Sequence, residues 1–384
     1  MKTFLRRLST VVIAGALCSL LTGCWDYRAI NTRSAVTGIG FDPVPGTPDK
    51  MRITIQVPIL SQSAGSSTSS STPGTNDAFE NISTEAYSVS EALRSLQTQM
   101  NRQPDIAELR IIVFNAKLSP QMMDTAVAQL IRVPTINRLA RVVTTPDNTQ
   151  EVFGVKGTDT TPMGFLDQAF NMSEQGYVVS RELWQYWRDA TQVGVVPVVP
   201  IVTASSTNGG NGNRLTTAGV YVYLNNQISF TLTRKQTLYV NFLTGNVKNM
   251  ALDVPVQSGE AALTNVSVNS RLRCFSQGNH VVLYDRVSIS GTLAKVPSAT
   301  PKPIPPTDLN WLQDEVSKYL AEQLMETIQT LQQHRADVIG FGRIYLQHHP
   351  EEEAKLKAQW GEVFQHAKPQ IVVQVRISSK GELI

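Results

Sequence analysis

The sequence has few cysteines, which limits how the fold can be stabilised. Its 384 residues include three, Cys18, Cys24 and Cys274. Cys18 lies in an apolar N-terminal segment, and modification of Cys24 would leave Cys274 as the one free thiol. A single thiol cannot form an intrachain disulfide, so the fold must depend on packing. A structural zinc site is equally unsupported, because it needs several thiolate or imidazole ligands.

Beyond its first 23 residues, the chain also has no excess of positive or negative charge. The formal net charge is +3, from 34 basic and 31 acidic residues. Lys2, Arg6 and Arg7 account for the whole excess, because the first 23 residues contain no Asp or Glu. The neutral remainder has no bulk electrostatic attraction for DNA, RNA or anionic lipid, which excludes a basic nucleic-acid-binding protein.

No hydrophobic run is long enough to span a bilayer. The N-terminal run, Leu8–Leu21, would extend about 21 Å as a helix, whereas the hydrocarbon core is about 30 Å thick. A second run at residues 194–203 is shorter and contains Pro197 and Pro200. A positive start, an apolar middle and small residues before a cysteine are typical of a cleaved signal peptide, which we assign to residues 1–23.

The signal ends in Leu21-Thr22-Gly23-Cys24, which resembles the bacterial lipobox. Small residues before the cysteine admit the signal peptidase, and the thiol accepts a diacylglyceryl group. We predict lipidation of Cys24 and a short tether at residues 24–33. The alternative is an ordinary secretory signal in which this cysteine is incidental. Two acyl chains hold a protein to a membrane stably, at about 0.8 kcal/mol per buried CH₂. We therefore expect a body tied to the outer face of a membrane.

Recognisable catalytic and cofactor motifs are absent from the sequence. Gly38-Ile39-Gly40 could begin a dinucleotide-binding loop, but Pro43 stands where a third glycine is needed. There is no GxxxxGK[ST] loop and no GxSxG elbow. Cys274 lies within a predicted strand, so we interpret it as a core residue rather than a nucleophile. These absences disfavour an enzyme and predict no catalytic residue and no cofactor.

One cluster of candidate metal ligands occurs at residues 348–353, with the sequence His-His-Pro-Glu-Glu-Glu. Pro350 interrupts the helix that would align these side chains, and adjacent histidines point apart. Acidic residues suit a helix N-terminus, so we favour the solvated start of a helix over a metal site. His280, His334 and His366 lack an HExxH-like spacing.

The first half of the chain alternates strands and helices. Met51–Val57 alternates apolar and polar residues, which is typical of a half-buried strand, and residues 34–41 are its expected partner. A capping box at residues 88–91 begins a helix. Another helix lies between predicted strands at 108–114 and 138–144, which indicates at least one parallel pair.

Three segments of this half have unusual composition. Residues 61–77 are almost all Ser, Thr, Gly and Pro, so we expect a mobile loop, with a binding role as the alternative. Residues 159–188 carry six aromatic side chains, whose near-helical spacing favours a core role over a ligand site. The Gly/Asn-rich segment 205–214 is a predicted domain boundary.

The second half is rich in strands and then helical. Turns containing asparagine separate its strands and indicate an antiparallel sheet. The strands are predicted at 218–224, 228–232, 237–242, 266–275 and 280–289. A proline-rich connector, 297–306, precedes a leucine-striped helix at about 308–335. A second helix at 351–364 and a closing strand at 371–377 follow.

Together these elements predict a multi-domain α+β protein. A mixed sheet with helices is expected in the N-terminal half, and an antiparallel sheet plus a long helix in the C-terminal half. After the signal peptide and the tether, we expect an N-terminal α/β-type domain at 34–204 and a C-terminal domain at 215–384.

Three segments resemble the Ger(x)C family, the C-subunit lipoproteins of bacterial spore germination receptors. The first runs from the lipobox through Cys24-Trp25-Asp26-Tyr27-Arg28-Ala29-Ile30-Asn31. The second, Thr216-Thr217-Ala218-Gly219-Val220-Tyr221-Val222-Tyr223, looks like the start of the family's C-terminal domain. The third is Asp337-Val338-Ile339-Gly340-Phe341-Gly342, followed by Pro350, Trp360, Phe364 and a terminal strand. The resemblance covers nearly the whole chain after the signal peptide.

The resemblance implies a non-enzymatic, lipid-anchored subunit on the outer face of the inner spore membrane. Its partners would be an A subunit with soluble and membrane portions and a transporter-like B subunit. The complex responds to small nutrients, and the C subunit would be required for its assembly and signalling. Cys24 is the one functional residue carried over, and we do not expect this subunit alone to bind nutrients tightly.

Two other classes of protein remain as alternatives. A lipid-anchored solute-binding protein would deliver a small molecule to a membrane transporter, but it would have two similar α/β lobes around a cleft. The strand-rich second half and the long helix argue against that architecture. A cell-wall hydrolase would require catalytic spacing that the sequence does not contain.

Overall fold

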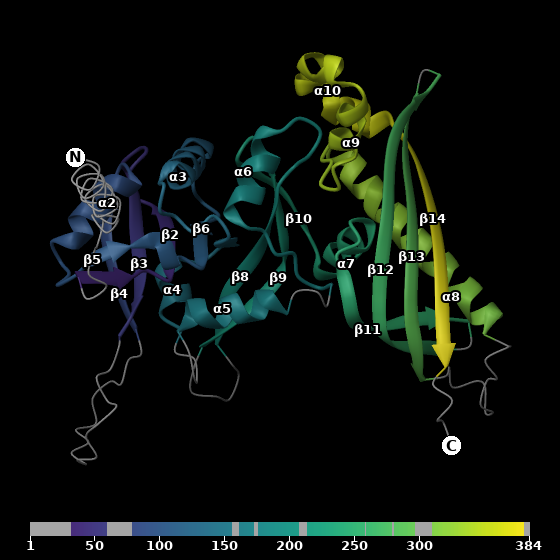
Figure 1. The fold of residues 1–384 in the computed structure, drawn as a ribbon, viewed down its shortest axis with the longest axis horizontal. Helices are drawn as coiled ribbons and strands as arrows, with labels where there is room; N and C mark the ends of the chain where they lie inside the picture. The colour runs from purple at the N-terminus through teal and green to yellow at the C-terminus, as the bar shows by residue number, and fades with distance from the viewer. Residues whose placement is uncertain are drawn as a thin grey trace, which may run out of the picture.

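The computed structural model describes residues 32–59, 79–155, 161–172, 176–206, 213–257, 259–278, 280–295 and 309–379. Its elements form two parts, an N-terminal part (residues 32–232) and a C-terminal part (residues 233–379), which lie side by side in Figure 1. The predicted signal peptide, the lipidation site, the 61–77 loop and the 297–306 connector lie outside the described residues. No described helix combines the length and the apolar character needed to cross a membrane.

An eight-stranded mixed sheet organises the N-terminal part, in the order β10-β9-β8-β7-β6-β2-β3-β4. Strands β2, β6, β7 and β8 are parallel, and antiparallel strands extend the sheet at both edges. The bounds are Gly38–Pro43 (β2), Met51–Pro58 (β3), Phe79–Ala86 (β4), Ile111–Asn115 (β6), Arg141–Thr145 (β7), Val198–Ser206 (β8), Asn213–Leu224 (β9) and Gln227–Leu232 (β10). The parallel β6–β7 pair confirms the predicted strand–helix–strand unit. A small parallel pair, β1 (Arg33–Ala35) with β5 (Gln103–Asp105), lies apart from this sheet.

Helices cover both faces of the eight-stranded sheet. They are α2 (Val89–Gln97), α3 (Pro120–Arg132), α4 (Thr149–Phe153), α5 (Pro162–Asn171) and α6 (Leu183–Thr191). Helices α2, α3 and α6 pack on the face that presents Ile39 and Phe41. Helices α4 and α5 pack on the opposite face, against Ile111 and Val113.

Helix caps in this part confirm the pattern read from the sequence. The Ser88 hydroxyl accepts a hydrogen bond from the Glu91 amide at 3.1 Å, so the capping residue of α2 is the expected one. The Glu91 carboxylate accepts from the Tyr87 amide rather than from Ser88. Ser119 caps α3 in the same way, with Pro120 at the first helical position.

Strand β3 differs from the prediction of a half-buried strand. Its polar residues Thr54 and Gln56 are 0% exposed, like the apolar Ile55 between them. The cause is the layer of α4 and α5, which covers the face expected to meet water. The Gln56 side chain donates to the Phe153 carbonyl at 3.2 Å and accepts from the Met163 amide at 3.3 Å. These bonds compensate for the burial of its amide group.

A four-stranded sheet, in the order β11-β12-β13-β14, forms the C-terminal part with four α-helices on one of its faces. The bounds are α7 (Arg234–Leu243), β11 (Val247–Val256), β12 (Gly259–Gln277), β13 (His280–Lys295), α8 (Asn310–Gln333), α9 (Phe341–His348), α10 (Glu353–His366) and β14 (Lys368–Ser379). Strands β11 to β13 are antiparallel, but β14 is parallel to β13. The sheet is therefore mixed, because the chain passes through α8, α9 and α10 before it returns as β14.

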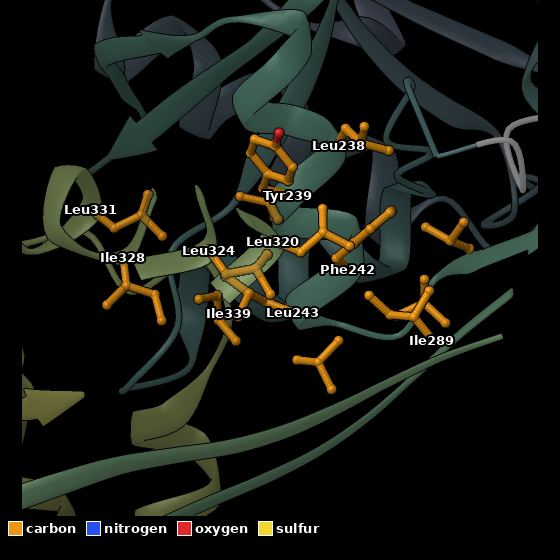
Figure 2. Close-up of a cluster of buried hydrophobic side chains, with 14 of the residues drawn as sticks. Leu238, Tyr239, Phe242, Leu243, Ile289, Leu320, Leu324, Ile328, Leu331 and Ile339 are labelled. Atoms are coloured by element: carbon orange, nitrogen blue, oxygen red, sulfur yellow. The ribbon is translucent and has the colours of Figure 1, made fainter. Parts of the chain in front are cut away.

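Helices α7 and α8 bury their apolar sides against this sheet, as Figure 2 shows for Phe242, Leu320 and Ile289. The leucine stripe that predicted α8 is confirmed, since every member is at most 2% exposed. The members are Leu309, Leu312, Val316, Leu320, Leu324, Ile328 and Leu331.

One strand predicted for the second half is wrong, and two others belong to a different sheet from the rest. Residues 237–242 form most of helix α7 rather than a strand, and Thr233 and Gln236 cap it reciprocally. The strands expected at 218–224 and 228–232 lie in β9 and β10, which belong to the eight-stranded sheet. Strands β8 and β9 come before and after the middle of the Gly/Asn-rich segment and pair with each other in this sheet.

Candidate functional site

The turn between α8 and α9 is organised around a buried carboxylate, Asp337. It is 0% exposed and accepts hydrogen bonds from the amides of Gly340 and Gly342, each at 2.8 Å, and Phe341, at 3.2 Å. The Trp360 indole of α10 donates a fourth bond at 3.0 Å. Burial raises the pKa of Asp337, and these four hydrogen bonds oppose that shift. One side chain thereby fixes the start of α9 and its contact with α10.

This turn contacts the segment between α6 and β8 through backbone groups. The Val196 amide donates to the Asp337 carbonyl at 2.8 Å, and the Arg343 amide donates to the Gly194 carbonyl at 3.0 Å. Gly194 has a φ of +84°, and a Cβ there would lie 2.3 Å from the carbonyl carbon of Gly342. We call this contact between residues 189–196 and 337–343 the junction.

Charged side chains lie beside the backbone contacts of the junction. Asp189 is 2% exposed, and its carboxylate lies 2.7 Å from the Arg188 guanidinium and 3.8 Å from that of Arg343. The Nε atom of Arg181 is buried and has no hydrogen-bond partner. Burial lowers the pKa of Arg181, and the charge of Asp189 opposes this shift. Asp189 is therefore the buried anion that compensates several neighbouring guanidinium groups.

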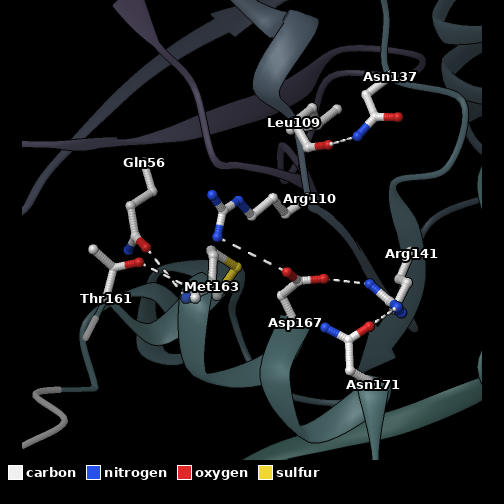
Figure 3. Close-up of polar contacts among 10 residues, drawn as sticks. Gln56, Leu109, Arg110, Asn137, Arg141, Thr161, Met163, Asp167 and Asn171 are labelled. Carbon is white, nitrogen blue, oxygen red and sulfur yellow. Dashed lines mark hydrogen bonds and ion pairs between the residues drawn. The ribbon is translucent and has the colours of Figure 1, made fainter. Parts of the chain in front are cut away.

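A second polar cluster connects β6, β7 and α5, as Figure 3 shows. Asp167 of α5 forms ion pairs with Arg141 at the start of β7 and, at 3.9 Å, with Arg110 just before β6. Arg141 also donates to Asn171 at 2.5 Å and to Ser180 at 3.1 Å. Every one of these partners belongs to the N-terminal part, so the cluster positions α5 against the beginnings of the central strands β6 and β7.

Gly38, Gly40 and Cys274, the candidates for cofactor binding or nucleophilic chemistry, lie at closely packed positions in strands. Gly38 and Gly40 are in β2, where a Cβ would lie 2.4 Å from Met163 and 2.7 Å from Thr149. Their role is close packing under α4 and α5. Cys274 is 4% exposed, and burial raises the pKa of its thiol, as expected of a core residue.

The structure brings together three of the candidate metal ligands at residues 348–353. The candidate ligand atoms of His349, Glu351 and Glu352 all lie within 4.8 Å of one another. His348 is not in this group, and Glu351 is 68% exposed. Residues Pro350–Glu352 form a short 3₁₀ turn immediately before α10, and His349 precedes this turn.

The aromatic segment at 159–188 is divided between core and surface. Phe170 and Tyr186 are at most 2% exposed, which confirms the core interpretation for them. That interpretation is wrong for Phe165, Trp184 and Trp187, whose exposed fractions are 46%, 37% and 43%. The two tryptophans are three positions apart on α6 and share one side of it, whereas Tyr186 faces the core.

The fold and the junction define a two-part α+β protein. A turn of its C-terminal part packs through backbone contacts on a loop of its N-terminal part. A family described as the N-terminal domain of spore germination proteins matches residues 26–204, and one described as the spore germination B3/GerAC-like C-terminal domain matches residues 218–381. The chain belongs to the Ger(x)C family of spore germination proteins.

Individual relatives agree with this family over nearly the whole chain. A Bacillus subtilis (strain 168) protein, YfkR, described as a spore germination protein, is 21% identical over 374 residues, covering 96% of this chain and 95% of the relative. The crystal structure of the GerBC protein has the same fold, with a TM-score of 0.56 and 14% identity. That match covers 88% of this chain and 96% of GerBC.

Proposed function

We propose that this chain is the lipid-anchored, non-enzymatic C subunit of a nutrient germinant receptor, required for receptor assembly and signalling. It would be held on the outer face of the inner spore membrane by diacylglyceryl-Cys24, beside the A and B membrane subunits. The observation that carries the proposal is the match of both family domains along one chain. Membership of this family implies association with a germinant receptor complex.

The junction supports a role as a rigid body in such a complex. Backbone hydrogen bonds and the approach of Gly194 to Gly342 fix the α8–α9 turn against the N-terminal part. A rigid body tethered to the membrane has a high effective concentration for docking on neighbouring subunits, because only a small volume is accessible to it. Such a role requires no catalytic group.

The architecture disfavours a solute-binding protein that delivers a ligand to a transporter. That class has two similar α/β lobes. Here an eight-stranded sheet is covered by helices on both faces, whereas a four-stranded sheet carries helices on one face. Calorimetry with the purified body and candidate nutrients separates the two functions, and micromolar binding would favour the solute-binding protein.

Membrane fractionation of sporulating cells tests the anchoring. In Cys24→Ala the thiol that accepts the diacylglyceryl group is absent, so the protein should lose its lipid label and leave the membrane fraction. A Cys274→Ala variant is the matched control, because it removes the other thiol of the mature chain and should remain membrane-bound. Unchanged lipid labelling of Cys24→Ala would contradict the proposal.

A further inference from the structure

The outward face of the four-stranded sheet carries a concentration of positive charge. Helices α7 to α10 cover the opposite face, where Leu283, Val287 and Ile289 are buried. Because side chains alternate along a strand, the intervening positions of β12, β13 and β14 point away from the helices. The cations at these outward positions are Arg271, Arg273, Arg286, Lys368 and Arg376, and all of them are exposed. We call these residues the basic face.

No carboxylate lies among these cations on the described stretches of β12, β13 and β14 that carry them. Asp253 and Glu260 are exposed at outward positions of β11 and β12, but at the opposite end of β12 from Arg271. The other outward positions between 269 and 275, 282 and 290, and 368 and 376 are uncharged. They are Asn269, Phe275, Val282, Tyr284, Ser288, Ser290, Gln370, Val372 and Gln374. Asp285 points to the interior, where it is 0% exposed and accepts from Ser270 at 2.8 Å. The charge is therefore clustered locally although the chain after residue 23 is neutral overall.

Two of the cations face each other directly across the ladder. Arg271 is the register partner of Arg286 in the β12–β13 pair. Like charges at opposed positions destabilise a sheet, and neither residue forms an ion pair with any described residue. An anion above the pair would remove this repulsion, so the face has electrostatic complementarity to a negatively charged partner.

The extent of the face favours a surface over a small ligand. Lys368 and Arg376 are the ends of an eight-residue interval on β14, which corresponds to about 27 Å at the rise of a strand. A hollow of about 820 Å³ lies at the Arg376 end of the face. Its lining includes Ser267, Ser290 and Gln374, which are donors for phosphate oxygens.

Exposed apolar groups accompany the charges. Phe275 is 40% exposed and Val372 is 38% exposed, and both point outward on this face. Cations combined with a few exposed aromatic or aliphatic groups are the chemistry of peripheral binding to anionic bilayers. We propose that the basic face docks on a membrane surface rich in anionic phospholipid. This contact is separate from acylation of Cys24.

Vesicle binding of the predicted mature chain, residues 24–384 with Cys24→Ser, tests the proposal without an acyl anchor. The expected result is sedimentation with vesicles of equal parts phosphatidylglycerol and phosphatidylcholine at about 0.1 M salt, and loss of binding at about 1 M. Vesicles of phosphatidylcholine alone should not bind the protein. Absence of binding to the anionic vesicles, or equal binding to both vesicles, would overturn the proposal.

Charge-neutralising variants locate the contact. Arg271→Gln combined with Arg286→Gln should weaken vesicle binding about 25-fold, since each basic residue near an anionic surface contributes roughly a fivefold effect. The matched control is Lys355→Gln with Lys357→Gln on the exposed side of α10, which changes the net charge equally. It should change binding less than about twofold. Equal loss in both double variants would overturn the proposal, because it would show an effect of net charge alone.

The same experiment includes controls for misfolding of the variants and for an acidic protein segment as the partner. The Arg271→Gln and Arg286→Gln variant should melt no lower than its parent, because a like-charge contact is removed. Arg273→Gln with Arg376→Gln repeats the test at positions that oppose Tyr284 and Ser290. Binding to soluble polyglutamate in the absence of vesicle binding would assign the face to an acidic protein segment and refute the lipid proposal. Because Cys24 is not acylated in this experiment, its failure would leave the receptor-subunit proposal unaffected.

Discussion

Gly194 and Gly342 approach so closely that neither position has space for a side chain. A Cβ on Gly342 would lie 2.4 Å from the Cα of Gly194 and 2.3 Å from the Trp360 ring. The two glycines come from the two parts of the molecule, one before β8 and the other in the first turn of α9. Their contact therefore couples the packing of the N-terminal part to that of the C-terminal part.

We predict that Gly342→Ala destabilises the protein by about 2–3 kcal/mol, because the added methyl group must displace backbone and an indole ring. Denaturant unfolding measures the loss. Gly46→Asn is the control, since Asn tolerates the positive φ of Gly46 and no atom lies within 4 Å of an added Cβ there. A loss for Gly342→Ala no larger than that of the control would contradict the close contact.

Asp189 provides a second test of the junction. Asp189→Asn removes the buried anion beside the guanidinium groups of Arg181, Arg188 and Arg343, so we expect a loss of about 3 kcal/mol in the free energy of unfolding. Asp314→Asn, at an exposed position of α8, is the matched control and should be nearly neutral. Equal stability of the two variants would show that Asp189 does not compensate its neighbours.

Asp285 should make stability depend on pH. Burial raises its pKa from 3.8 to about 7, although Ser270 and the Arg271 amide donate to it. A raised carboxyl pKa stabilises the fold fully below about pH 4, and this contribution disappears as the pH rises through about 7. Asp285→Asn resembles the protonated acid, so it should be more stable than the parent at pH 8 by roughly 2–4 kcal/mol and equally stable near pH 4. Denaturant unfolding across this pH range makes the comparison, and a pH-independent difference would contradict the assignment.

Cys274 should be chemically inert in the folded protein. Its thiol is buried in β12 and its pKa is raised by burial, so the reactive thiolate is scarce. We predict no reaction with a thiol-specific reagent under native conditions and one reactive thiol in denaturant for the Cys24→Ser body. Rapid native labelling would show that this strand opens or is exposed.

Local patterns in the sequence predicted the elements that are stabilised locally. The leucine stripe of α8 and the Ser88 and Ser119 caps are short-range signals, and each lies where expected. Helix α7 was missed because its apolar run resembles a strand, yet Thr233 followed by Gln236 is a capping signal that identifies its start. The three-residue spacing of Trp184 and Trp187 places them on one side of a helix, so the sequence could have distinguished these exposed residues from the buried Tyr186.

Long-range pairing could not be predicted in the same way. Nothing within residues 213–232 indicates that β9 pairs with β8 and extends the N-terminal sheet. The junction is equally non-local, because Val196 and Asp337 are far apart in the sequence and meet only in the folded structure. The Asp337-to-Gly342 motif was visible through its family resemblance, but its role in positioning α9 required the four hydrogen bonds of the Asp337 carboxylate.

Nutrient-triggered germination of spores tests the central claim most directly. In a strain in which this receptor is the sole one, deletion of the chain should abolish ion release on addition of the nutrient, and the wild-type gene should restore it. Cys24→Ala should fail to restore it, whereas Cys274→Ala should succeed. Spores that lack the chain and still respond to the nutrient at the wild-type rate would contradict the assignment as a receptor subunit.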